Sequence, residues 1–144
     1  MTTKEWLSRA WDIDNEIKLL IDEQKTALNR ATGSNFSKNK EKVQTSRKNI
    51  SESKFTNYVS YSELIDSLVD ELYTVKREIV LAIWNVKDRT LRMLLFARYV
   101  QFKTWEQVAE IIHKQDVKWV RTAIHSRALK NISSFLQNDI DSNN

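Results

Sequence analysis

Proline and cysteine are absent from this chain of 144 residues, and glycine occurs once, at Gly33. Sheet proteins depend on tight turns, and such turns draw heavily on Gly and Pro. Leu, Ile, Lys, Glu and Ala are abundant instead, and most of these residues favour helix. The composition therefore predicts an all-α protein. The lack of cysteine also excludes a disulfide framework and a thiolate metal site.

Long apolar runs are also missing. No segment approaches the roughly 18 uncharged apolar residues of a membrane span. The first residues carry Lys4, Glu5 and Arg9 and lack the apolar core of a signal peptide. We therefore expect a cytoplasmic protein with no membrane partner.

Motifs for catalysis are not found either. The sequence has no nucleophile–base–orienter set, no HExxH pattern and no Gly-rich phosphate loop. We expect no enzyme activity and no cofactor. Glu106, Glu110 and His113 have a spacing that could bind a metal on one helical face. A solvated face is favoured over a metal site, because apolar residues occupy the opposite side of the same helix.

Charge is present but unevenly distributed. The net charge is +4, yet residues 89–130 carry nine basic and three acidic side chains, and residues 57–88 carry three basic and six acidic ones. Residues 32–56 are also basic, with six against two. Segregation of this kind indicates a polyanion-binding region on an otherwise acidic scaffold.

Two heptad patterns predict a long antiparallel helical hairpin, similar to a coiled coil, over residues 1–88. Residues 3–31 are predicted to form one helix, and residues 60–87 a second, with Ser60 and Glu63 as a capping box. The matching seams suggest that the helices pair within one chain or between two copies. The first seam is Trp6, Ala10, Ile13, Ile17, Leu20, Gln24 and Ala27; the second is Tyr61, Ile65, Leu68, Leu72, Val75, Ile79, Ala82 and Val86.

Residues 32–56 lie between the two patterns and are rich in Ser, Asn, Thr and Lys. They contain too few apolar groups to offset their conformational entropy by burial. We expect a flexible basic linker, whose lysines either track a DNA backbone or remain solvated.

Three shorter helices are predicted in residues 89–136, followed by a polar tail at 137–144. Their expected N-caps are Asp88, Thr104 and Asp116, with Gln107 completing a capping box at Thr104. The second and third helices, from Trp105 to about Ile112 and from Val117 to about Leu136, fit a helix-turn-helix. Ala109 provides the small residue where the helices cross, and "HKQD" (113–116) forms the turn, with His113 where Gly is usual.

The helix starting near residue 117 would then read the major groove of double-stranded DNA. Arg121 can pair bidentately with guanine, and Thr122 or Ser126 can meet several bases. Trp119 either packs on the preceding helix or touches sugar and base. Arg127 and Lys130 suit phosphates. The complete set of candidate DNA-binding residues is Lys103, Lys114, Lys118, Trp119, Arg121, Thr122, His125, Ser126, Arg127 and Lys130.

The stretch "RYVQFKTWEQVAEII…IHSRALKNI" resembles the C-terminal part of sigma factor region four. It is also similar to a family of small phage-encoded proteins of Gram-positive hosts, related to the ArpU and RinA late-gene regulators. The resemblance is carried by Arg98 and Tyr99, by the run from Thr104 to Ala109, and by Arg127-Ala128-Leu129. It extends weakly to "TTKEWLSRAWDIDNEI" and "VKREIVLAIWNV". The resemblance implies DNA-binding transcriptional regulation of prophage genes in a bacterial host cell.

Three functions remain open at this point. The first is a sequence-specific transcription regulator that binds DNA, with a hairpin that makes it a homodimer or docks it on RNA polymerase. The second is a DNA-packaging component resembling a small terminase subunit, which also joins a helix-turn-helix to helical oligomerisation elements. The third is a coiled-coil interaction module that does not bind DNA.

Overall fold

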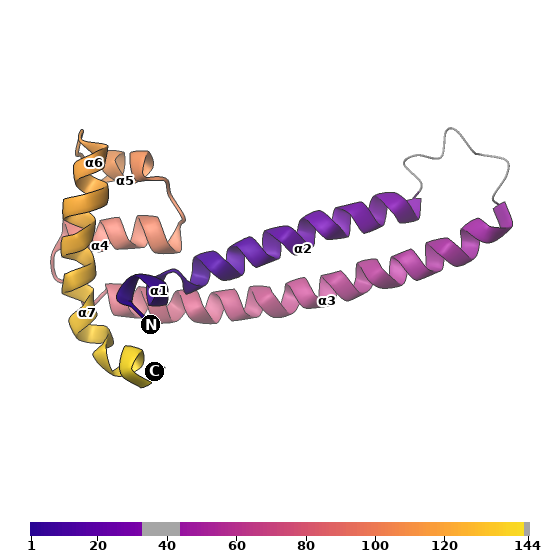
Figure 1. Cartoon of the computed structure of the whole chain (residues 1–144), viewed down its shortest axis with the longest axis horizontal. Helices are drawn as coiled ribbons and strands as arrows, with labels where there is room; N and C mark the ends of the chain where they lie inside the picture. Colours follow the sequence, from indigo (N-terminus) through magenta and orange to yellow (C-terminus); the bar gives the residue numbers. More distant parts are fainter. Residues whose placement is uncertain (33–43, 143–144) are drawn as a thin grey trace. The chain divides into compact units, whose positions relative to one another are not determined.

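The protein is helical throughout the part that the computed structural model describes, and no strand occurs there. The backbone is described for residues 1–32 and 44–142, and side chains for residues 1–30 and 58–137. The prediction of an all-α protein is confirmed for these residues (Figure 1). No helix in the same ranges has the length and apolar content to cross a membrane.

The chain forms two compact units. One comprises Met1–Ile13 together with Leu72–Asn144, and the other comprises Asp14–Glu71. The first unit contains the basic C-terminal region and is therefore the one that holds the predicted binding site.

The unit Asp14–Glu71 is built from parts of α2 (Arg9–Thr32) and α3 (Gln44–Ile83). The two helices are joined through Gln24, whose Nε2 donates to the carbonyl of Tyr58 at 3.2 Å and to the hydroxyl of Ser62 at 2.5 Å. Their seam residues are the more covered ones: Ile17 is buried, and Leu20, Ala27, Tyr61, Ile65 and Leu68 are half-buried. The predicted seams are thus the inward faces of these helices.

The start of α3 corrects the predicted boundaries. The helix begins at Gln44, so Ser60 lies inside it and does not cap it. The predicted linker 32–56 is accordingly helical from Gln44 onward, and its residues 33–43 lie outside the described residues. Low apolar content limits burial, but it does not stop a helix that is already nucleated, because each polar residue costs only tenths of a kcal/mol. Neither Gly nor Pro is present in this stretch to end it.

The predicted helix 3–31 is interrupted near its start. Helix α1 (Thr3–Leu7) ends before Ser8, and α2 begins at Arg9. The Ser8 hydroxyl donates to the carbonyl of Lys4 at 2.7 Å, a bond that competes with the backbone ladder and bends helices. Thr2 and Glu5 form a capping box ahead of α1. Helix α1 packs against α7 and buries Trp6 and Leu7.

The C-terminal helices follow the prediction closely. Helix α4 (Arg89–Leu95) continues into a π-helical turn, η2 (Phe96–Val100), and α5 spans Trp105–Ile111. Helix α6 (Val117–Trp119), the π-helical turn η3 (Val120–Ile124) and α7 (His125–Ser142) follow one another without a break. All three predicted caps are formed: Asp88 accepts from the Leu91 amide and Asp116 from the Trp119 amide, both at 3.1 Å, and Thr104 and Gln107 form a capping box.

The core of this unit is made by the apolar faces of its helices. Ala109, at the centre of α5, is 2% exposed, so a second helix packs closely over it. Trp105 and Val117 are half-buried. The buried residues of these helices include Leu91, Leu94, Leu95, Tyr99, Val108, Ile112, Val120, Ile124, Ala128 and Ile132.

Arg98 anchors the segment that leads into α5. Its guanidinium carbon lies 5.1 Å from the Trp11 ring centroid and 4.6 Å from that of Trp105. Its Nη1 also donates to the carbonyl of Lys103 at 2.9 Å. Because Arg stacks on indole faces and can donate in the ring plane at the same time, one side chain holds the loop and the start of α5 together.

Candidate nucleic-acid interface

The turn between α5 and the α6–α7 helix is closed by His113. Its φ is 58°, in the left-handed region. The His113 amide donates to the carbonyl of Glu110 at 3.1 Å, and the Lys114 amide donates to that of Ala109 at 2.9 Å. This pair of bonds is a Schellman motif, in which the left-handed position is usually Gly. The sequence predicted that His113 takes the place of the usual Gly. The left-handed backbone conformation forms with His113 at this position.

The left-handed conformation has a cost. A Cβ in this region approaches the following carbonyl and costs about 1–2 kcal/mol. The packing of the whole unit offsets this cost. Ala109, for example, is buried where the two helices on either side of the turn cross. Two backbone hydrogen bonds tie the turn to α5, although His113 itself is exposed.

The π-helical turn η3 sets which residues face outward. A π-helical turn contains one residue more than an α-helical turn. Each residue after η3 is therefore rotated back by one position around the helix axis. It faces the direction that the residue before it would face in an uninterrupted α-helix. With this shift, Lys118, Thr122, Ser126 and Lys130 share one outward face, and all four are exposed.

The same shift corrects the prediction for His125. It follows Lys118 by seven residues, close to two α-helical turns, so an unbroken α-helix would expose both. Instead His125 is 7% exposed, and its assignment to the exposed DNA-binding face is wrong. The extra residue in η3 rotates His125 to the side of Val120 and Ile124.

His125 belongs to a buried aromatic cluster behind the interface. Its ring centroid lies 5.8 Å from that of Tyr99, in a stacked arrangement, and 4.6 Å from that of Trp105, edge to face. The Tyr99 hydroxyl and His125 Nε2 are 2.5 Å apart. In the tautomer whose proton sits on Nδ1, this nitrogen can donate to the Arg121 backbone, and Nε2 accepts from the Tyr99 hydroxyl.

Both members of this pair are held neutral. Burial lowers the pKa of His125 to about 4, helped by the nearby cations Lys4 and Arg98, while the bond to Arg121 acts in the opposite direction. Burial raises the pKa of Tyr99 to about 12. The Tyr99–His125 hydrogen bond thus persists at neutral pH and fixes the first turns of the α6–η3–α7 helix against η2.

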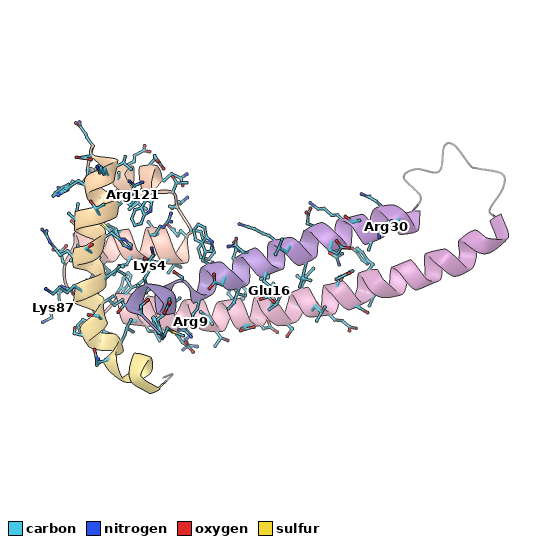
Figure 2. All side chains as sticks on the ribbon, viewed as in Figure 1. Lys4, Arg9, Glu16, Arg30, Lys87 and Arg121 are labelled. Carbon is cyan, nitrogen blue, oxygen red and sulfur yellow. The ribbon has the colours of Figure 1, made fainter. Side chains whose placement is uncertain are left out.

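The outer surface of this helix is polar and basic. Arg121 and Arg127 are exposed on either side of the row formed by Lys118, Thr122, Ser126 and Lys130. Figure 2 shows Arg121 on the segment that follows α6. Among the described side chains, none of Lys118, Arg121 and Lys130 forms an ion pair with a carboxylate. Their charges are therefore available to an external anion.

The remaining candidates flank this row. Trp119 is 43% exposed, and the Lys114 ammonium lies 5.9 Å from its ring centroid. Lys114 is exposed, whereas Lys103 is half-buried and its own carbonyl accepts from Arg98. The structure thus brings Lys114, Trp119 and the outward row to one surface and leaves His125 beneath it.

The π-helical turn was missed from the sequence, although a signal for it exists. The buried residues Val120, Ile124, Ala128, Ile132 and Leu136 are spaced four apart throughout. On a pure α-helix this repeat drifts around the surface, since 3.6 residues make a turn. A five-member repeat of four therefore indicates an additional residue in one of the turns.

No family model, curated protein or solved structure matches the chain. The function of this surface must therefore be inferred from its own residues.

Proposed function

We propose that the protein is a sequence-specific DNA-binding regulator of transcription in which the α6–η3–α7 helix enters the major groove. The observation that carries the proposal is the exposed row Lys118, Thr122, Ser126 and Lys130 on a helix that follows α5 through a tight turn. A helix-turn-helix needs such a second helix, with its N-terminal side chains free to reach base edges.

Each exposed side chain suits a different contact. Arg121 has the planar fork that pairs with the O6 and N7 of guanine, and the hydroxyls of Thr122 and Ser126 can meet several base edges. The Thr122 hydroxyl donates to the carbonyl of Lys118 at 2.7 Å, which leaves its lone pairs to accept from a base. Arg127 and Lys130, further along the helix, suit the phosphate backbone.

The buried pair Tyr99–His125 supports this role indirectly. It lies under the same turns that present Arg121 and Thr122, and it fixes them without any charge. A reading helix benefits from this support because side chains held by a second layer lose less entropy on binding.

The proposal also gives a role to the unit Asp14–Glu71, which contains most of α2 and part of α3. Helices α2 and α3 would form an antiparallel hairpin that makes the protein a homodimer or docks it on RNA polymerase. Dimers of helix-turn-helix proteins read two half-sites separated by about one turn of DNA. A palindromic site is therefore expected.

The test is selection from a random double-stranded DNA library, followed by affinity measurements on the enriched and on a scrambled duplex. Arg121→Ala should lose about 1–3 kcal/mol on the enriched duplex only, since it removes a base contact. Lys130→Ala should weaken both duplexes by a similar factor, and Lys25→Ala, which changes an exposed lysine on α2, should alter neither. Failure to enrich any sequence, or an equal effect of Arg121→Ala on both duplexes, refutes the assignment.

A further inference from the structure

A groove of about 320 Å³ opens on the unit that contains the C-terminal helices. Its walls are apolar and come from Trp84, Met93, Phe96 and Ile111, and two cations, Arg89 and Arg92, line it as well. Ligand pockets begin at about 300 Å³, so this groove suits a few protruding side chains better than a large cofactor.

The apolar surface around this groove is unusually open to solvent. Trp84 is 62% exposed and Met93 37%. Leu81, three residues before Trp84 in the chain, is 61% exposed. Isolated exposed apolar residues are ordinary, but neighbouring large ones beside a groove mark an interaction surface.

The charges at the groove select the partner. The Arg92 guanidinium carbon lies 5.1 Å from the Trp84 ring centroid, and Arg89 is exposed at the first position of α4. The nearest acidic residue in the sequence, Asp88, is engaged as the N-cap and accepts from the Leu91 amide. The groove therefore favours an apolar side chain flanked by carboxylates.

Helix α2 of the same chain carries this complement. Leu19 is 71% exposed, the highest value among the large apolar side chains of residues 1–30 and 58–137. Glu16, Asp22 and Glu23 are exposed and lie three or four residues from Leu19, hence beside it on the helix surface. Glu16 is labelled on α2 in Figure 2.

We propose that the groove binds the outer face of α2 from a second copy of the chain. Leu19 of one copy enters between Trp84 and Met93 of the other, and Glu16, Asp22 and Glu23 meet Arg89 and Arg92. In a two-fold dimer this contact forms twice. Because the contact forms twice, the total buried surface area comes closer to the roughly 1,200–2,000 Å² that stable interfaces bury. This association differs from pairing through the heptad seams, whose residues are turned inward, and it does not depend on DNA binding.

Sedimentation equilibrium of the full chain over a range of concentrations tests the proposal. The unaltered protein should be dimeric, and Leu19→Ala or Arg89→Glu should each raise the dimer dissociation constant at least tenfold. Both residues are exposed, so neither change should disturb folding, which circular dichroism can verify. Two matched controls should leave the dimer intact: Leu64→Ala, since Leu64 is exposed on α3, and Lys87→Glu, since Lys87 is exposed but does not line the groove.

A charge exchange makes the test specific to these two faces. Alone, the double variant Glu16→Lys/Glu23→Lys should dimerise at least tenfold more weakly than the unaltered protein, as should Arg89→Glu. Mixing the two should restore a dimer, because each copy then offers the opposite charge to the other's altered face. The proposal is overturned by an unaltered protein that stays monomeric, by a dimer that survives Leu19→Ala and Arg89→Glu, or by a mixture that does not associate. A monomer whose groove binds an unrelated acidic peptide would equally overturn the second copy as occupant.

Discussion

Lowering the pH from 7 to 5 should destabilise the protein through His125 alone by about 2 kcal/mol. The pKa of His125 is lowered from 6.5 to about 4 in the folded chain, chiefly by burial. The unfolded chain therefore binds more protons between these values, so the free energy of unfolding falls as the pH decreases from about 6.5 toward about 4. One pKa unit corresponds to 1.36 kcal/mol, so the lowered pKa of His125 contributes roughly 3 kcal/mol to the free energy of unfolding. About 2 kcal/mol of this contribution is lost by pH 5.

Urea unfolding at pH 7 and pH 5, followed by circular dichroism, measures this loss. His125→Gln removes the titrating group, so its stability should change much less between the two pH values even if the variant is less stable overall. His113→Gln changes the other, exposed histidine and should retain the full loss. Equal pH dependence in the unaltered protein and His125→Gln, or an NMR-titrated pKa for His125 near 6.5, would refute the reasoning.

Two further substitutions test the turn and the helix crossing. His113→Gly should raise the free energy of unfolding by about 1 kcal/mol, because the left-handed φ of 58° no longer strains a Cβ; Gln115→Gly in the same turn should bring no such gain in a urea titration. Ala109→Leu should cost about 1–3 kcal/mol and weaken DNA binding, because Ala109 is 2% exposed and has no room for a larger side chain. Ala123→Leu, at an exposed position of η3, is the matched control, and equal effects of the two leucines would contradict a close helix crossing at Ala109.

Local signals in the sequence predicted the C-terminal helices well. Asp88, Thr104 and Asp116 each cap the helix that the sequence assigned to them. Capping depends on one side chain and the next three residues, so it can be recognised without knowledge of the fold. The buried faces of α5 and the α6–η3–α7 helix were recognisable for a similar reason, since their apolar spacing is short-range.

Features that depend on helix continuation were predicted less well. Composition suggested a linker up to residue 56, yet α3 extends back to Gln44, because neither Gly nor Pro is present in that stretch to end the helix. The position of His125 failed for another reason. A single extra residue in η3 changes the facing of every later side chain, and ordinary helical periodicity does not include it.

The groove at Trp84 was not predicted at all. Its walls come from residues separated along the chain, Trp84 after α3, Met93 in α4 and Ile111 in α5. Only the tertiary packing of these elements creates the surface, so no sequence window contains its pattern.

The most direct test of DNA reading by the α6–η3–α7 helix is a salt titration of DNA binding. Fluorescence anisotropy on a duplex from the protein's own upstream region should show the logarithm of the binding constant falling linearly with the logarithm of salt concentration. Each lost phosphate contact should reduce the slope by about one, so Lys130→Ala should have a shallower slope than the unaltered protein, and Lys25→Ala an unchanged one. A flat response to salt, or identical slopes for all three proteins, would contradict DNA binding through this helix.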